Sequence, residues 1–172
     1  MERLSLIVTI AGIPLLLVSI RALVRRPNLT VGFVPSSTVG ILRWRRRKPL
    51  ANFDAKLTSM NEAVTLPVVI VNNGRASARE VLANFRFPAE LHVTVGGLPE
   101  YSHVEFHPEL KLWVWVLERA TIHPDDDFIA SAVLTAPAGL SGFDIDVEMS
   151  MANAARVKAK LRVELGRAGA AP

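Results

Sequence analysis

The chain has 172 residues, room for one compact domain and an appendage, since domains commonly contain roughly 100–200 residues. It has no cysteine, so disulfides, cysteine-ligated metal sites and thiol catalysis are excluded. The net charge of +4 is uneven: residues 1–48 hold nine Lys or Arg against one acid, and residues 49–172 hold eleven against fifteen. The basic charge belongs to the front of the chain, so the remainder is not the basic globule typical of nucleic-acid binding.

A long apolar segment opens the chain. Between Leu4 and Val24 only Arg21 is charged, and about twenty helical residues cross a hydrocarbon core of roughly 30 Å. A signal peptide would need a small-residue cleavage site after its apolar core, and a soluble core helix would carry a polar stripe. Neither feature is present here. We therefore predict a single transmembrane helix with a basic flank over residues 1–26.

Basic residues follow this span more densely than they precede it. Positive residues near a span favour the cytoplasmic side, which predicts an outside N-terminus and a cytoplasmic C-terminal domain at the cell inner membrane. Residues 27–49 are a juxtamembrane basic segment with the first strands. Its run RWRRRK either lies on anionic lipid, binds nucleic acid or is a solvated loop. We favour lipid, with these membrane-contact residues: Arg21, Arg25, Arg26, Arg43, Trp44, Arg45, Arg46, Arg47 and Lys48.

After Pro27 the apolar residues follow a period of two, with turn residues between short runs. Many short strands separated by turns are typical of antiparallel sandwiches and barrels. The predicted fold class is all-β, an antiparallel β-sandwich over residues 50–165, with a disordered tail over 166–172. The expected strands cover residues 29–34, 38–42, 53–60, 64–72, 80–87, 91–95, 103–107, 111–118, 127–135, 143–151 and 156–165.

The alternation also assigns faces. Along residues 143–151 the odd-numbered positions are apolar and the even-numbered ones are polar, and residues 156–165 place Val157, Leu161 and Val163 on one side. One face of each strand is thus expected to be buried and the other wet. Val68 to Val71 is continuously apolar, which is typical of a central strand.

Two stretches resemble a known family. LPVVIVNNGRASAREVLANFRFP (66–88) resembles the V-x-N-x-G-x-A-x-x-V pattern of bacterial and archaeal immunoglobulin-like sandwiches of the cell-adhesion-related, NEW3-like type. ATIHPDDDFIASAVLTAP (120–137) resembles their later L-x-P-G-E turn, with Asp125 in place of the glycine. The resemblance implies an immunoglobulin-like fold serving as a binding or spacer module. From the residues alone, Asn73-Gly74 is expected to close a turn at positive φ, capped by the side chain of Asn72.

Candidate chemistry is sparse. His103 and His107 are about 13 Å apart on an extended strand, too far for one metal ion without a bend. Asp125 to Asp127 either solvate a turn or offer oxygen ligands to calcium, and we favour the turn. The common nucleophile, phosphate-loop and dinucleotide motifs are missing from the sequence, so no catalytic residue, metal or cofactor is assigned. Trp113 and Trp115 share a face, and the run around them is either a fully buried strand or a core strand with a contact patch.

The sequence thus leads to three hypotheses. The first is a single-pass, non-enzymatic sandwich that acts as an interaction or sensing module at the cytoplasmic face of the membrane. The second is an oligomerising membrane effector whose helix perturbs the bilayer, and the third is an enzyme that uses the acidic loop. Expected partners are membrane lipid and an unidentified protein or a second copy of the chain, rather than nucleic acid.

Overall fold

The structure, a computed structural model, describes residues 26–34, 49–57, 63–96 and 102–167. These residues form ten strands: β1 (Leu29–Phe33), β2 (Asn52–Leu57), β3 (Ala63–Asn72), β4 (Ala78–Pro88), β5 (His92–Gly96), β6 (Ser102–His107), β7 (Leu112–Ile122), β8 (Asp127–Thr135), β9 (Gly142–Met151) and β10 (Ala154–Arg167). Among them there is no helix long and apolar enough to cross a membrane. The predicted span Leu4–Val24 lies outside the described residues.

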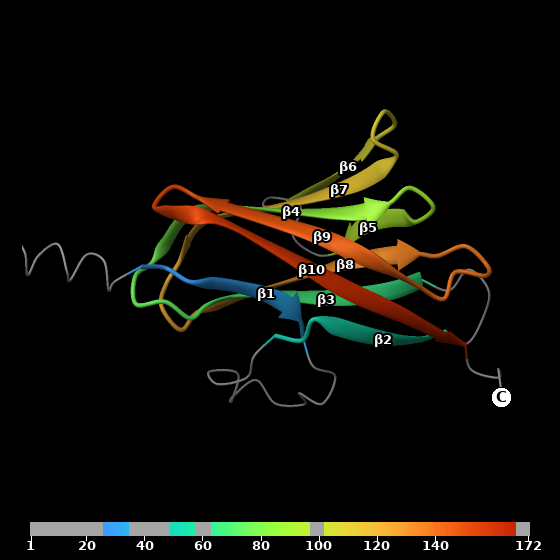
Figure 1. Cartoon of the computed structure of the whole chain (residues 1–172), viewed down its shortest axis with the longest axis horizontal. Helices are drawn as coiled ribbons and strands as arrows, with labels where there is room; N and C mark the ends of the chain where they lie inside the picture. The colour runs from blue at the N-terminus through green and yellow to red at the C-terminus, as the bar shows by residue number, and fades with distance from the viewer. Residues whose placement is uncertain (1–25, 35–48, 58–62, 97–101, 168–172) are drawn as a thin grey trace, which may run out of the picture.

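The strands form two layers that face each other (Figure 1). One sheet has the order β1-β3-β8-β5, and the other has the order β2-β10-β9-β4-β7-β6. All pairs are antiparallel except β2 and β10, which run parallel, so the expectation of wholly antiparallel sheets is wrong at this one pair. The two strands are far apart in the chain, and parallel neighbours need such a long connection, because a tight hairpin joins only antiparallel strands. β1 and β2 themselves belong to different sheets, and Leu50, just before β2, forms an isolated bridge with Phe33.

Most strands lie where the sequence predicts them. The observed β8 coincides with the expected strand 127–135, while β4 and β7 are longer than expected. The expected strand 38–42 lies outside the described residues. β1, from the segment 27–49, pairs with β3, and β10 includes Gly166 and Arg167, which the prediction placed in the tail.

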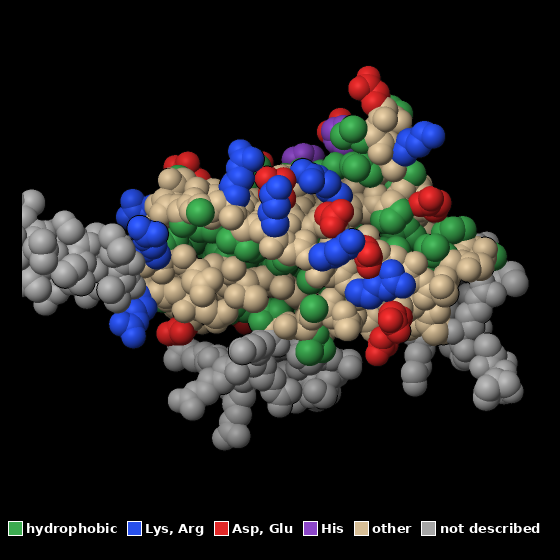
Figure 2. All heavy atoms as spheres, viewed as in Figure 1, with side chains coloured by type: hydrophobic (Ala, Val, Ile, Leu, Met, Phe, Trp, Pro, Cys, Tyr) green, Lys and Arg blue, Asp and Glu red, His purple; other side chains and the backbone are tan. Residues whose placement is uncertain are grey.

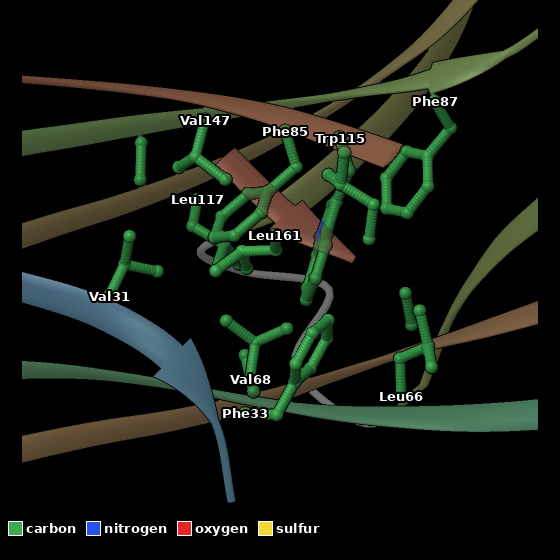
Figure 3. Close-up of a cluster of buried hydrophobic side chains, with 14 of the residues drawn as sticks. Val31, Phe33, Leu66, Val68, Phe85, Phe87, Trp115, Leu117, Val147 and Leu161 are labelled. Carbon is green, nitrogen blue, oxygen red and sulfur yellow. The ribbon is translucent and has the colours of Figure 1, made fainter. Parts of the chain in front are cut away.

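The core lies between the two sheets and is built by the predicted alternation (Figure 3). Phe33, Leu66 and Val68 point inward from one sheet, and Phe85 and Trp115 point inward from the other. The inward set of β9 is buried as expected: Phe143, Ile145, Val147, Met149 and Met151. Burial of each large apolar side chain contributes about 1.5–3 kcal/mol, so these residues dominate the stability of the sandwich.

The continuous apolar run on β3 has the central position that the sequence indicates. β3 lies between β1 and β8, and Val68, Val69 and Ile70 are all buried. Because both faces of β3 are covered at this point, alternation is lost there.

Candidate interaction surfaces

Of the nine predicted membrane-contact residues, the structure describes Arg26. Its side chain is exposed, and its carbonyl oxygen accepts a hydrogen bond of 3.2 Å from the backbone of Arg75. Outside the described residues lie Arg21, Arg25, Arg43, Trp44, Arg45, Arg46, Arg47 and Lys48. Arg26 therefore marks the end of the sandwich at which the predicted anchor joins it.

Asn72 organises this end of the sandwich, and its side chain is fully buried. Its Oδ1 accepts hydrogen bonds from the backbone nitrogens of Asn28 at 3.1 Å and Gly74 at 3.0 Å. Its Nδ2 donates to the carbonyl oxygens of Ala76 at 2.8 Å and Ile122 at 2.9 Å. Two bonds to each end of the amide satisfy its donors, so neither polar atom of this buried side chain is unpaired. The predicted capping role of Asn72 is confirmed. Its side chain also binds backbone groups outside the turn, those of Asn28 and Ile122.

The turn after Asn72 differs from the expectation. Among the described residues positive φ occurs at Glu80, Lys111, Asp125 and Gly139, so the prediction of positive φ at Asn73-Gly74 is wrong. Gly74 is required for another reason: a Cβ atom there would lie 2.4 Å from the carbonyl oxygen of Arg26 and 2.4 Å from the nitrogen of Asn28. The glycine allows two backbone segments to approach each other closely.

The acidic turn at residues 124–126 has a backbone role. Asp125 adopts φ of 61°, the left-handed conformation that aspartate tolerates better than most residues. Its nitrogen donates to the carbonyl oxygen of Asn72 at 3.0 Å, and the nitrogen of Asn72 donates to the carbonyl oxygen of Asp126 at 3.1 Å. Asp125 thus holds the left-handed position of this turn. No group of three or more potential metal ligands occurs within the described parts of the chain.

The four histidines lie at separate places. His103 and His107 are both on β6, where the Nε2 of His107 is 3.9 Å from a carboxylate oxygen of Glu105. The Nδ1 of His123 is 2.9 Å from the hydroxyl of Ser77. The ring of His92 packs edge-on against an indole on β7, as described next. Three of the four, His92, His107 and His123, thus have a side-chain contact of their own.

An aromatic cluster of His92, Phe106 and Trp113 lies toward the far end of the molecule. The ring centroid of Trp113 is 4.9 Å from that of Phe106 and 5.6 Å from that of His92. Phe106 is 40% exposed, and Leu110 in the adjoining turn is 67% exposed. The Nε1 atom of Trp113 is buried and has no hydrogen-bond partner among the described residues. The exposed apolar surface at this place therefore comes from Phe106 and Leu110, with Trp113 packed beneath Phe106.

Trp115 lies on the same inward face as Trp113 but is more deeply buried. It is fully buried, and its ring centroid is 4.9 Å from that of Phe85. On the other face of β7, Val114 and Val116 are half-buried. Of the two readings of this strand, the fully buried one is wrong, because Trp113 is half-buried and the hairpin of β6 and β7 projects from the body (Figure 1).

The outer face of the six-stranded sheet carries cross-strand ion pairs. Glu148 on β9 lies 3.0 Å from Arg86 and 3.3 Å from Arg156. Asp144 lies 3.0 Å from Arg162 and 3.1 Å from Lys160. Hydrogen bonds from Arg162 and then Lys160 lower the pKa of Asp144 below its ordinary 3.8. Figure 2 shows both signs of charge interspersed on this part of the surface. On the predicted polar face of β9, Glu148 and Asp144 are therefore each paired with two basic residues of neighbouring strands.

No protein-family model matches the chain, and no curated protein matches it. Among solved structures it is similar to an uncharacterized protein from Nocardia farcinica with an immunoglobulin-like fold: the TM-score is 0.53 and the identity 7%, over 68% of this chain and 99% of that one.

Two further neighbours have lower TM-scores. A cohesin module of a family 33 glycoside hydrolase from Clostridium perfringens gives 0.44 at 10% identity, over 83% of this chain and 98% of that one. A CARDB domain from Pyrococcus furiosus gives 0.41 at 12% identity, over 84% and 97%. The likeness to the Nocardia farcinica protein shows the fold: the described part of the chain is an immunoglobulin-like β-sandwich.

Proposed function

We propose that the chain is a single-pass membrane protein whose immunoglobulin-like sandwich acts as a non-enzymatic interaction or sensing module at the cytoplasmic face of the membrane. The observation that carries this proposal is that the two ends of the sandwich differ. Arg26 lies at one end, where its carbonyl oxygen accepts a hydrogen bond from Arg75 and the nearby Asn28 donates one to Asn72. The aromatic cluster lies toward the other end.

The length of β7 gives the separation of the two ends. This strand has 11 residues and runs from Leu112 beside the aromatic cluster to Ile122, whose carbonyl oxygen binds Asn72. At about 3.3 Å per residue, Trp113 and Ile122 are separated by about 30 Å. A helix joined at Arg26 would thus hold the aromatic cluster away from the bilayer, where a protein partner has access to it.

The surface chemistry at the far end supports protein binding. Aromatic side chains are enriched in the buried centres of protein interfaces, where they bring large contact area. Phe106 and Leu110 are two of the exposed large hydrophobic residues in the described part of the chain, and the ring of Trp113 packs against Phe106. Confinement to a membrane surface would raise the effective concentration of such a module toward its partner.

The anchor is tested by extracting membranes that carry the full chain with alkaline carbonate, together with reporter fusions at each terminus. We expect the chain to stay in the membrane pellet and a C-terminal phosphatase fusion to be inactive. Release of the chain into the supernatant would refute the anchor, and an active phosphatase fusion would refute the cytoplasmic placement.

The interaction role is tested by affinity capture from detergent-solubilised membranes with the full chain and with Leu110→Ser. Ile129→Ser is the matched control, because Ile129 is also exposed, at 45%, but lies on the other sheet. We expect Leu110→Ser alone to lose the captured partner. Equal capture by both variants would refute a role for the far end of the sandwich.

The role of the helix is tested by replacing residues 4–24 with an unrelated membrane span. Retained capture and cellular function would support an anchor. Loss of function with retained insertion would support the bilayer-perturbing alternative instead.

A further inference from the structure

β6 is the last strand of the six-stranded sheet on the side of the aromatic cluster. Among the described residues it pairs with β7 alone, so no described strand lies along the other edge of its central residues, His103 to Phe106. An edge of this kind is the usual place for strand addition. The opposite edge of the same sheet is β2, and Leu50, which precedes it, forms an isolated bridge with Phe33 of β1.

The β6 edge lacks two residue types that commonly prevent pairing. Its sequence SHVEFH contains neither proline nor lysine, both of which natural sheets use to protect an edge. His103, Glu105 and Phe106 are exposed. The exposed phenyl ring makes the edge apolar on the face that it shares with Trp113 and Val104.

The charges on β6 are self-complementary in one register. In an antiparallel pair formed by two copies of β6 about a two-fold axis, directly opposite residues lie on the same face of the joined sheet. An axis at Val104 places His103 of each copy opposite Glu105 of the other. An axis at Glu105 would instead place the two carboxylates opposite each other, which is destabilising.

We propose that β6 pairs with β6 of a second copy of this chain, antiparallel and centred on Val104, so that two six-stranded sheets become continuous. This pairing deepens the proposed interaction module by naming one partner surface, and it does not depend on the membrane anchor. A two-fold contact of this type is isologous, as in most homodimers. The pairing would place apolar contacts between the Val104 side chains and beside Phe106.

Because the chain has no cysteine, a single introduced cysteine gives a direct test in the full chain, solubilised in detergent. Val104→Cys places two thiols directly opposite each other, with Cβ atoms about 4.5–5.5 Å apart. We expect a short bismaleimide to convert most of this variant to a covalent dimer. Thr94→Cys is the matched control because Thr94 is an exposed residue on β5, the edge strand of the other sheet. Cross-linking of Val104→Cys no greater than that of Thr94→Cys would overturn the proposal.

A charge swap tests the register. In the Val104→Cys background, His103→Glu places carboxylates opposite each other at two positions, and we expect the rate of dimer cross-linking to fall about tenfold. The double variant His103→Glu with Glu105→His restores opposite pairs and should restore the rate. Failure of the double variant to recover, with an unchanged unfolding midpoint, would overturn the register.

Light scattering of the chain without cysteine checks the same pairing independently of thiol chemistry. We expect a dimer that His103→Glu dissociates, and an unchanged mass for His103→Glu would count against the pairing. Cross-linking of Val104→Cys in cells to a different protein, with no homodimer, would also overturn the proposal. Carbonate extraction remains the separate measure of the anchor, so failure of one proposal is distinguishable from failure of the other.

Discussion

The side-chain nitrogen of Asn72 donates a hydrogen bond of 2.9 Å to the carbonyl oxygen of Ile122, fifty residues further along the chain. Asn72 ends β3 in the four-stranded sheet, and Ile122 ends β7 in the six-stranded sheet. One buried amide therefore joins the two layers at the end where Arg26 lies.

Replacement of Asn72 by alanine should be strongly destabilising, because it leaves the buried carbonyl oxygen of Ile122 without this partner and also removes part-buried bonds to the backbone of Asn28 and Ala76. We expect the free energy of unfolding to fall by about 3 kcal/mol, measured by urea denaturation of the full chain in detergent. Asn73→Ala is the control, since Asn73 is exposed and donates to the hydroxyl of Thr30 at 3.0 Å. It should cost less than about 1 kcal/mol. Equal effects of the two changes would contradict the role of Asn72.

Gly74→Ala should displace the residues that precede β1. Its Cβ would lie 2.4 Å from the carbonyl oxygen of Arg26, which is backbone and cannot rotate away. We expect a loss of about 2 kcal/mol in the free energy of unfolding. Gly166→Ala is matched in chemistry, but its Cβ would make an ordinary contact of 3.7 Å with the carbonyl oxygen of Ala55. That change should stay within about 0.5 kcal/mol of the parent. A tolerated Gly74→Ala would refute the close approach.

Trp115 and Leu110 should respond differently to truncation. Trp115→Ala removes a fully buried indole and should lower the free energy of unfolding by about 3–5 kcal/mol. Leu110→Ala, at a side chain that is 67% exposed, should change it by less than about 0.5 kcal/mol. Chemical denaturation followed by circular dichroism measures both. A large loss for Leu110→Ala would mean that the hairpin contributes to the core.

Asp144 should make stability depend on pH in the acidic range. Its pKa is lowered in the folded state by Arg162 and then Lys160, so the folded state favours the ionised form. The stabilisation is present above the ordinary value of 3.8 and is lost as the pH falls through the folded pKa. Carbon-detected NMR titration should show the carboxyl midpoint below 3.8. Arg162→Gln should raise it more than Lys160→Gln, and an equal response would contradict the order of the two contributions.

Much of the fold follows from local pattern in the sequence. The odd-numbered apolar residues of β9 are buried and its even-numbered residues are not, because a strand turns successive side chains to opposite faces. The central position of β3 follows in the same way from Val68 to Ile70, where a continuous apolar run needs cover on both sides.

Pairing between distant strands could not be predicted in this way. Arg162 lies opposite Asn52 in a parallel pair, and nothing in the local pattern of either strand specifies its partner. The same limit applies to Asn72: its neighbours Asn73 and Gly74 suggested a local turn, whereas its partners Asn28 and Ile122 come from other elements. The aromatic cluster was missed for this reason too, since His92 joins Trp113 from the other sheet.

β1 begins at one end of the sandwich and β10 finishes at the other (Figure 1). Tension between an anchor joined at Arg26 and a load on the C-terminal end would therefore run along the strands. The pairs between β1 and β3, from Leu29 with Asn72 to Phe33 with Val68, would be sheared together and would not open one at a time. The sandwich would thus act as a stiff mechanical link that transmits force.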